Sequence, residues 1–283
     1  MIQNVEASLQ ALSASQPFDT AWAVHDIARG VAYTRDGNLV VPAASTRKIP
    51  ILMACLSAVA EKRLDLDRRV VIQPHHQEND SGLVCHLRPF LSLTLFDALT
   101  LMTIVSDNCC TMALMELLGF ERLLAWSEEC GFTGMRHVAG TPANSFMNHP
   151  TPTDMTQMAT TTPDDMCRLL RMIIAGIDSA ADAARLRTTP VLCTVALDIM
   201  SRQQYRASIP KLLPVGTRVA HKTGWGRSCE NDAGIVFNDK GPLYVIAAYT
   251  RNVPPLSVNG LAGRALAMDF IGDLSAICWL SMN

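Results

Sequence analysis

The spacing of apolar residues divides the chain into strand-like ends and a helical middle. Near the start, Val5, Leu9 and Leu12 recur at helical spacing and predict a helix over residues 3–15. Two short apolar runs separated by a turn predict strands over residues 21–27 and 31–33. The middle of the chain predicts helices over residues 45–60, 91–103, 109–118, 120–129, 164–177 and 194–203.

The last third of the chain returns to strand-like patterns. Runs at residues 219–222, 233–237 and 244–249 predict three strands, with a hairpin turn at residues 238–241, and residues 261–280 predict a closing helix. Strands at both ends with helices between them predict an α/β (α+β) fold, an antiparallel sheet flanked by helices and built from both termini. We therefore expect an α/β domain from residues 1–43 plus 205–283 and an inserted all-helical domain from residues 44–204, with the active site between them.

Composition and charge exclude some classes of function. The 283 residues carry 24 Lys and Arg against 26 Asp and Glu, a formal net charge of -2, which argues against a nucleic-acid or anionic-membrane binder. The longest apolar stretch, residues 49–60, is internal and too short to span a membrane, so we expect a buried core helix. The first residues carry no basic segment and the first arginine is Arg29. This predicts a cytoplasmic protein, although an exported form with its leader removed would look the same.

Cysteines and histidines give no sign of a metal centre. The nine cysteines contain no C-x-x-C, which is typical of reduced, mostly buried thiols in a cytosolic protein. The seven histidines form no spaced ligand motif, and the one close pair, His75 and His76, is expected to point apart as neighbours on a strand or loop do. We expect neither a metal nor a cofactor.

Three short motifs in order suggest acyl-transfer chemistry. They are residues 45–48 (Ser-Thr-Arg-Lys), 106–108 (Ser-Asp-Asn) and 222–224 (Lys-Thr-Gly). A serine hydroxyl needs a nearby group to take its proton, and a lysine one helical turn later can supply it. Burial in the apolar helix would lower the pKa of Lys48 and make it a credible base. Singly, Ser45 could be a helix cap and Lys48 a solvated lysine, but the three motifs together favour a nucleophile and its proton acceptor.

With these motifs the chain resembles a class A β-lactamase-like serine hydrolase of the penicillin-recognising serine enzyme superfamily. The resemblance extends to residues 81–83 (Ser-Gly-Leu), 160–166 (Thr-Thr-Thr-Pro-Asp-Asp-Met), 213–217 (Leu-Pro-Val-Gly-Thr), 221–226 (His-Lys-Thr-Gly-Trp-Gly) and 231–232 (Asn-Asp). It implies an acyl-enzyme formed on Ser45 with a β-lactam or related amide, a small-molecule substrate that bears a carboxylate.

The resemblance also implies roles for the remaining motif residues. Ser106 would relay a proton to the leaving nitrogen, and Asn108 would bind the substrate amide. Lys222 and Thr223 would bind the substrate carboxylate, while Gly224 lets the substrate approach the strand edge. The backbone N–H groups of Ser45 and Trp225 would form the oxyanion hole. Asp107 is expected to have a structural role in its motif.

One departure from the family concerns the release of the acyl group. The glutamate that activates water in class A enzymes has no counterpart, because no Glu occurs between Cys130 and Cys229. Its place falls near Phe146, and the only acid in that loop is Asp154. Three hypotheses stay open. Lys48 serves both half-reactions, His149 is the base, or an amine acceptor resolves the acyl-enzyme.

Two further departures stand close to the third motif. Trp225 takes a place where the family commonly has smaller polar residues, so we expect a narrower pocket or a stacking surface. Cys229 follows in the next turn, where we expect a buried small hydrophobe.

The leading hypothesis is therefore a metal-free serine hydrolase that acts on β-lactams. The enzymatic alternative is an intracellular amidase, esterase or acyltransferase with a similar site. The alternative of another class is a binding protein that is acylated once and turns over slowly, although no sensor, membrane or DNA-binding segment accompanies it. The sequence does not determine the oligomeric state.

Overall fold

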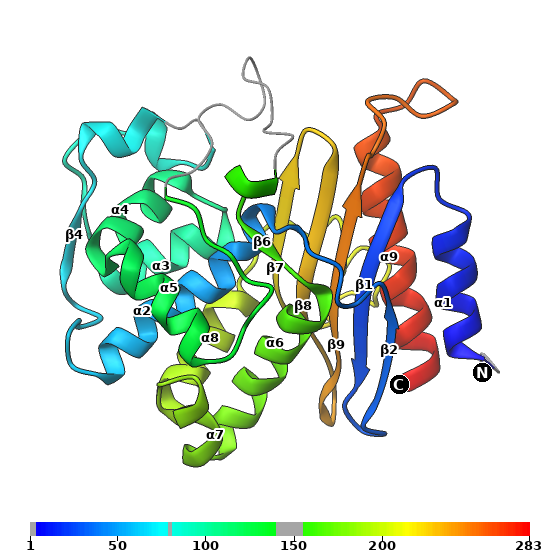
Figure 1. Ribbon diagram of the computed structural model, residues 1–283, viewed down its shortest axis with the longest axis horizontal. Helices are drawn as coiled ribbons and strands as arrows, with labels where there is room; N and C mark the ends of the chain where they lie inside the picture. Colours follow the sequence, from blue (N-terminus) through cyan, green and yellow to red (C-terminus); the bar gives the residue numbers. More distant parts are fainter. Residues whose placement is uncertain (1–3, 79–80, 140–154) are drawn as a thin grey trace. The chain divides into compact units, whose positions relative to one another are not determined.

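The computed structural model describes residues 4–78, 81–139 and 155–283 (Figure 1). Contacts among these residues divide the chain into two compact units. We call them the sheet unit (Met1–Thr46, Thr161–Arg171 and Tyr205–Asn283) and the helical unit (Arg47–Thr160 and Met172–Gln204). The segment Thr161–Arg171 belongs to the sheet unit, whereas the sequence analysis placed it in the helical insertion.

The sheet unit is built around a five-stranded antiparallel sheet with the strand order β2-β1-β9-β8-β7 (Figure 1). Its strands are β1 (Asp19–Asp26), β2 (Val31–Arg35), β7 (Val219–Gly226), β8 (Cys229–Asn238) and β9 (Gly241–Arg251). The two ends of the chain meet because β1 pairs with β9 along its whole length, from Asp19 opposite Arg251 to Asp26 opposite Tyr244. The predicted antiparallel sheet built from both termini is confirmed.

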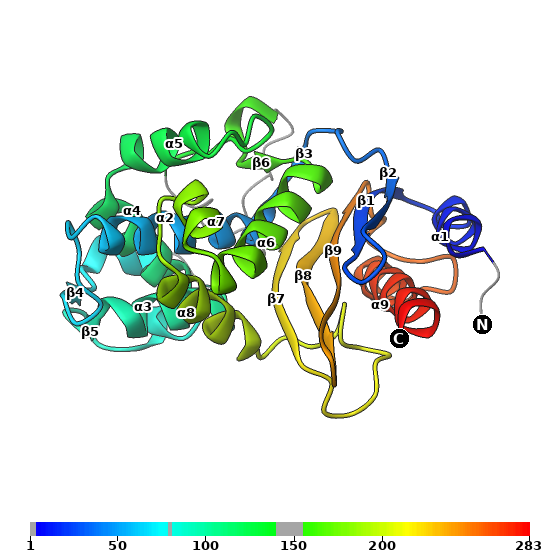
Figure 2. The same ribbon diagram turned by 90° about the horizontal axis from the view of Figure 1, so that it is seen from below.

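Two terminal helices cover one face of this sheet, as Figure 2 shows for α1 (Val5–Ala14) and α9 (Gly263–Met282). Their apolar side chains and those of the strands form one core, which includes Leu9 from α1, Phe270 and Leu274 from α9, and Trp22 and Ile246 from the sheet. All five side chains are buried. Because burial of apolar area drives folding, this core fixes the sheet on which the third motif lies.

Helix α9 is the one helix among the described residues that is long and apolar enough to cross a membrane. Half of its apolar window is buried inside the protein, against β8 and β9. The hydroxyl of Tyr244 donates to the Ser275 carbonyl oxygen at 2.9 Å, a polar contact between strand and helix within the core. The helix therefore serves as a core helix of the sheet unit.

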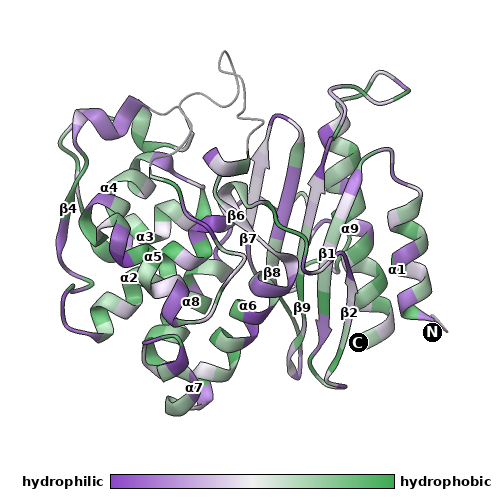
Figure 3. Cartoon of the chain, viewed as in Figure 1, coloured by the Kyte–Doolittle hydropathy of each residue, from purple (hydrophilic) through white to green (hydrophobic). Residues whose placement is uncertain are grey.

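The helical unit packs its helices around α2, whose residues are nearly all buried. Its helices are α2 (Lys48–Ala60), α3 (Leu95–Ile104), α4 (Asn108–Leu118), α5 (Phe120–Glu129), α7 (Ala180–Arg185) and α8 (Pro190–Ser201). Figure 3 shows the hydrophobic character of α2 and α3. The unit also contains a two-stranded sheet of β4 (Arg69–Val71) and β5 (Ser92–Thr94). Helix α6 (Pro163–Asp178) and the short strands β3 (Val41–Pro42) and β6 (Thr160–Thr161) complete the α-helices and strands among the described residues.

Local chemistry explains where two predicted helices actually begin. The predicted helix over residues 91–103 starts only at Leu95, because Thr94 caps it by accepting a hydrogen bond from the Asp97 N–H, and the residues before it pair with β4. The predicted helix over residues 45–60 begins as a 3-10 turn, Ala44–Arg47, and becomes α-helical only at Lys48. Helix α7 was not predicted.

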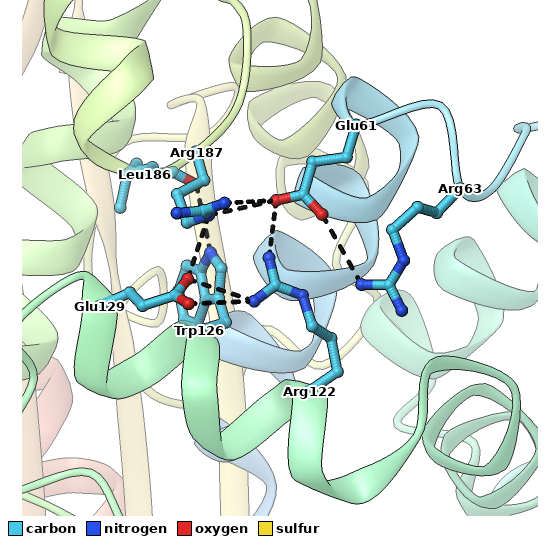
Figure 4. Close-up of polar contacts among 7 residues, drawn as sticks. All are labelled: Glu61, Arg63, Arg122, Trp126, Glu129, Leu186 and Arg187. Carbon is cyan, nitrogen blue, oxygen red and sulfur yellow. Dashed lines mark hydrogen bonds and ion pairs between the residues drawn. The ribbon is translucent and has the colours of Figure 1, made fainter.

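A network of ion pairs joins three separate segments of the helical unit (Figure 4). Glu61, at the end of α2, accepts from Arg122 of α5 at 2.6 Å and from Arg187, which precedes α8, at 3.0 Å. Glu129 of α5 pairs with the same two arginines, at 3.2 and 3.1 Å. Trp126 adds a buried hydrogen bond to the Leu186 carbonyl oxygen at 3.1 Å. These contacts hold the end of α2, the helix that begins with Lys48 of the first motif.

Candidate active site

A buried lysine amine brings the first and second motifs together in the helical unit. Lys48 is the first residue of α2 and is 1% exposed. Its Nζ donates to the Ser106 carbonyl oxygen at 2.7 Å, to Ser106 Oγ at 3.0 Å and to Asn108 Oδ1 at 2.7 Å. We call these three residues the Lys48 cluster. The structure thus joins three residues that the sequence analysis selected as site residues.

The partners of Lys48 suit a group that exchanges a proton. The carbonyl oxygens of Ser106 and Asn108 can only accept hydrogen bonds, whereas the Ser106 hydroxyl can accept or donate. An ammonium donates to all three, while a neutral amine donates to the two carbonyls and turns its lone pair to the hydroxyl. The cluster can therefore hold Lys48 in either protonation state.

The loop that carries Ser106 is held in an unusual conformation. Ser106 has a φ of 57°, in the left-handed region that non-glycine residues adopt only when their surroundings impose it. Asp107 supplies part of that constraint, since its Oδ1 accepts from the Cys110 N–H at 2.9 Å and its Oδ2 from the Leu83 and Val84 N–H groups at 2.8 Å. Asp107 thus caps α4 and fastens a neighbouring loop, which agrees with the structural role expected for it.

In the sheet unit, Ser45 lies half-buried in the 3-10 turn before α2. The residue before it, Ala44, has a φ of 46°, a second left-handed position beside a proposed functional residue. Thr46 stabilises the turn by donating from Oγ1 to the Ala43 carbonyl oxygen at 2.6 Å. Sequence analysis placed Ser45 in the first turn of an α-helix, and the tight turn replaces that helix start.

Strand β7 lies against the backbone of this turn. A Cβ added to Gly224 would come within 2.8 Å of the Ser45 nitrogen and 2.9 Å of the Thr46 nitrogen, closer than real Cβ contacts allow. Only glycine therefore permits this approach. The strand residue that follows is Trp225, so the two N–H groups expected to form an oxyanion hole belong to segments that touch within one unit.

Lys222 and Thr223 of β7 are both buried. Burial lowers the pKa of Lys222 to about 7, although the negative charge of Asp232 opposes the shift. Its Nζ donates to the Thr223 carbonyl oxygen at 2.7 Å. Within the described part of the chain, no hydrogen-bond partner reaches Thr223 Oγ1. A buried hydroxyl without a partner is costly, so this oxygen is a natural contact for a bound ligand.

The side chain of Trp225 lies in a cluster that the sequence analysis missed. Its ring meets the Tyr205 ring edge to face, with the ring centroids 5.2 Å apart. The guanidinium carbon of Arg264 lies 5.9 Å from the centroid of the Trp225 ring. Arg264 pairs with Glu230 at 2.7 Å, and Glu230 stands directly opposite Trp225 in the β7–β8 pairing. Burial raises the pKa of Glu230 to about 7 against the effect of Arg264. The signal was hidden because the predicted strand began only at residue 233, whereas β8 begins at Cys229.

His149 and Cys229 were also named by the sequence analysis. His149, the candidate deacylation base, lies outside the described residues, as do Phe146 and Asp154. Cys229 is partly exposed, whereas a buried residue was expected, and all nine cysteines are free thiols.

The histidine pair behaves differently from the prediction. His75 and His76 do not point apart, because both lie in a 3-10 turn and their rings meet edge to face with centroids 4.1 Å apart. Their Nε2 atoms both contact Glu116 Oε2, at 3.0 and 2.8 Å. The Gln73 N–H donates to His76 Nδ1 at 3.0 Å, so the ring proton resides on Nε2 and points at Glu116. In this tautomer the group is a hydrogen-bonded cluster whose buried histidine offers no lone pair to a metal.

Comparisons with known proteins show which family and which solved structures the chain resembles. The sequence model of the beta-lactamase enzyme family matches residues 4–281. A β-lactamase from Sphaerobacter thermophilus is 25% identical, with a TM-score of 0.82 over 98% of this chain and 96% of that chain. PBP-A is 26% identical, with a TM-score of 0.80 over 99% and 96%. A PBP-A mutant in an acyl-enzyme complex with penicillin G is also 26% identical, with a TM-score of 0.79 over 99% and 96%. No curated protein matches.

Proposed function

Because this chain belongs to the beta-lactamase enzyme family, we propose that it forms an acyl-enzyme on Ser45 with β-lactams and related amides. The observation that carries this proposal is the Lys48 cluster. In this cluster the buried amine of Lys48 donates hydrogen bonds to the Ser106 hydroxyl and to the Asn108 amide oxygen. Lys48 also follows the proposed nucleophile by three residues in the sequence. A serine that must lose its proton at neutral pH needs such a group.

The proposed acylation proceeds in two steps. Ser45 Oγ attacks the lactam carbonyl carbon while Lys48 accepts the hydroxyl proton, and the N–H groups of Ser45 and Trp225 stabilise the oxyanion. The C–N bond then breaks as Ser106 passes a proton to the leaving nitrogen and Lys48 returns one to Ser106. This relay rests on the hydroxyl of Ser106, the one partner of Lys48 in the cluster that can both accept and donate.

The third motif supports binding of an anionic substrate. Lys222 would provide positive charge and Thr223 a free hydroxyl for a substrate carboxylate, two features that complement each other chemically. Relatives named β-lactamases and the penicillin G acyl-enzyme of a PBP-A mutant make a penicillin-like molecule the first substrate to test. In its more specific form, the proposal is that the protein degrades such antibiotics and thereby gives resistance to them.

A second candidate function is favoured by one sequence fact. No Glu occurs between Cys130 and Cys229, so the family's water-activating residue is missing. Acylation does not depend on that residue in the mechanism above, but release of the acyl group does. A protein that is acylated once and turns over slowly would retain the observed residues. Hydrolysis with Lys48 as base in both half-reactions is the competing outcome.

The decisive experiment follows the intact mass of the protein after mixing with penicillin G. We expect the mass to increase by one penicillin, with the adduct on the peptide that contains Ser45. Ser45→Ala should stay unmodified, and Ser81→Ala, a serine outside the proposed chemistry, should react like the wild type. An unmodified wild type that also leaves penicillin G intact would overturn the proposal, and so would an adduct that persists in Ser45→Ala.

A further inference from the structure

Two cysteine thiols meet beside the second motif, and the proposed reaction uses neither. Cys85 lies in a 3-10 turn, Val84–His86, and Cys109 is the second residue of α4, directly after Asn108. Their side chains are hydrogen-bonded to each other. The Cys85 thiol also donates to the Gly82 carbonyl oxygen at 3.8 Å. Both residues belong to the helical unit.

The backbone around the two thiols is held together independently of the sulfur atoms. The Asn108 N–H donates to the Ser81 carbonyl oxygen at 2.9 Å, and Asp107 accepts from the Leu83 and Val84 N–H groups. Gly82 makes room for this contact, since an added Cβ would meet Asp107 Oδ2 at 2.4 Å. The turn with Cys85 and the start of the helix with Cys109 are thus held against each other before any bond joins the sulfurs.

The two thiols differ in their access to solvent, and this difference determines which of them an oxidant reaches first. Of the nine cysteines, seven are buried, and only Cys85 and Cys229 are partly exposed. A small oxidant therefore reaches Cys85 before Cys109, which is fully buried. Burial, with the nearby charge of Asp107, raises the pKa of Cys109 to about 12. Cys109 therefore stays a protonated thiol and does not itself attack the oxidant.

We propose that hydrogen peroxide converts Cys85 and Cys109 into a reversible disulfide that ties the loop of residues 81–87 to the second motif. The thiolate of Cys85 attacks the peroxide O–O bond, and a sulfenic acid and hydroxide form. The Cys109 sulfur then displaces the sulfenic oxygen, which leaves as water with the Cys109 proton, and the S–S bond is made. In total, two thiols lose two hydrogens and one peroxide becomes two waters. A small thiol reverses the step.

The bond would act on the Lys48 cluster through one covalent neighbour. An S–S bond of about 2.0 Å draws the sulfurs closer together than a thiol hydrogen bond does, so Cys109 moves toward the turn. Asn108, the preceding residue, accepts from Lys48 Nζ at 2.7 Å and shares any displacement of the helix start. Oxidation should therefore slow acylation of Ser45, an effect that rests on the proposed function. The reducing cytoplasm expected from the sequence would keep the enzyme active until peroxide rises.

Peptide mapping tests the bond without reference to activity. Wild-type protein treated with hydrogen peroxide and then alkylated should yield a linked Cys85–Cys109 peptide pair, which dithiothreitol separates. Cys85→Ser should give no linked pair. Cys229→Ser, which removes the other partly exposed thiol, should give the same pair as the wild type. A different pairing, such as one through Cys110, would overturn the proposal, and so would irreversible oxidation of Cys85 without a link.

Acylation kinetics test the regulatory effect. We expect oxidised wild-type protein to acylate about tenfold more slowly than the reduced protein, with recovery after dithiothreitol. Cys85→Ser and Cys109→Ala should keep their rates after peroxide. Equal rates for reduced and oxidised wild type, in samples with the mapped link, would refute the regulatory effect. Absence of acylation in the reduced protein would refute the proposed function instead, while the mapping still decides the disulfide.

Discussion

Lys48 combines a buried amine with partners that are themselves buried or partly buried. Ser106 is fully buried, and its carbonyl oxygen lies 2.7 Å from Lys48 Nζ. The lysine thus supports the left-handed conformation of Ser106 as well as the proposed proton transfer. Replacing Lys48 by alanine would remove both functions and also leave a cavity, whose destabilising effect could not be separated from them. A variant that keeps the side-chain volume is therefore the better probe.

We predict that Lys48→Met lowers the rate of acylation by about 10²–10⁴-fold, the usual contribution of a general base. The variant should also be less stable by about 1–3 kcal/mol, because buried acceptors lose a donor. Stopped-flow acylation and urea denaturation measure the two effects. Lys240→Met, at an exposed lysine of the β8–β9 turn, should change neither. Acylation of Lys48→Met at the wild-type rate would remove Lys48 from the mechanism.

Lys222 provides a prediction about pH. Its pKa is lowered to about 7 by burial, so the amine is charged below that pH and neutral above it. We predict that kcat/KM for acylation by penicillin G falls as pH rises through about 7, up to about tenfold per pH unit. The methyl ester of penicillin G has no carboxylate and should not show this additional fall.

Two comparisons isolate Lys222 in that experiment. Any titration of Lys48 would affect acid and ester alike, so only the ratio of their rates reports on the carboxylate. Glu230 has a raised pKa of about 7 as well, and Glu230→Gln removes that group while Lys222 stays. The ratio should keep its pH dependence in Glu230→Gln. A ratio that is constant with pH would show that Lys222 does not bind the carboxylate through its charge.

At the scale of elements, the ion-pair network around Glu61 joins the end of α2 to α5 and to the segment before α8. Burial works against ionisation of Glu61, but the hydrogen bond from Arg187 and the charge of Arg122 outweigh it, and the pKa of Glu61 is lowered. A carboxylate whose pKa is lowered by folding stabilises the fold above its unfolded pKa, and this stabilisation is lost as pH falls through the folded value.

We predict that Glu61→Gln lowers the free energy of unfolding by about 1 kcal/mol at neutral pH, since each partly exposed pair contributes roughly 0.2–1 kcal/mol. The loss should shrink as the pH is lowered below the ordinary range of a carboxyl group. Asp198→Asn, which breaks the single exposed ion pair between Asp198 of α8 and Arg202 just after it, should change stability much less. Thermal unfolding as a function of pH measures both variants. Equal losses in the two would show that the network adds nothing beyond a single pair.

The elements also show what the sequence could predict. The apolar run after Lys48 predicted a buried helix, and α2 is one, because a helix that is apolar on all sides must lie inside the protein. The left-handed backbone of Ala44 could not be foreseen, since nothing in an alanine favours it and only the surrounding contacts impose it. The tight turn at Ser45 was therefore missed, although its neighbourhood was correctly selected.

The candidate site likewise contains residues that the sequence could predict and residues that it could not. Lys48, Ser106 and Asn108 could be selected because three motifs in order specify them, and the structure brings these three together. The pairing of Glu230 with Arg264 beside Trp225 could not, because it depends on strand register and on contact with a helix more than thirty residues away. The Cys85–Cys109 contact has the same origin, since two ordinary thiols meet only through the docking of their backbones.

At the scale of the whole molecule, the chain has more of the groups for acylation than for release of the acyl group. The nucleophile, amine, relay hydroxyl and carboxylate-binding residues that we propose come from segments 45–48, 106–108 and 222–225. The stretch between Cys130 and Cys229, which would supply the water-activating glutamate, contains none. We expect such a molecule to accumulate its covalent intermediate, since the family's base for the second step is missing.

We therefore predict burst kinetics with nitrocefin, in which one equivalent of product per enzyme forms rapidly and a slower steady state follows. Hydroxylamine, a strong amine nucleophile, should raise the steady-state rate without changing the burst if release is limiting. Ser45→Ala should show neither phase. Linear turnover without a burst would mean that another group activates water efficiently, and His149→Ala would then ask whether the loop histidine is that group. A burst that hydroxylamine leaves unchanged would place the slow step elsewhere and contradict the prediction.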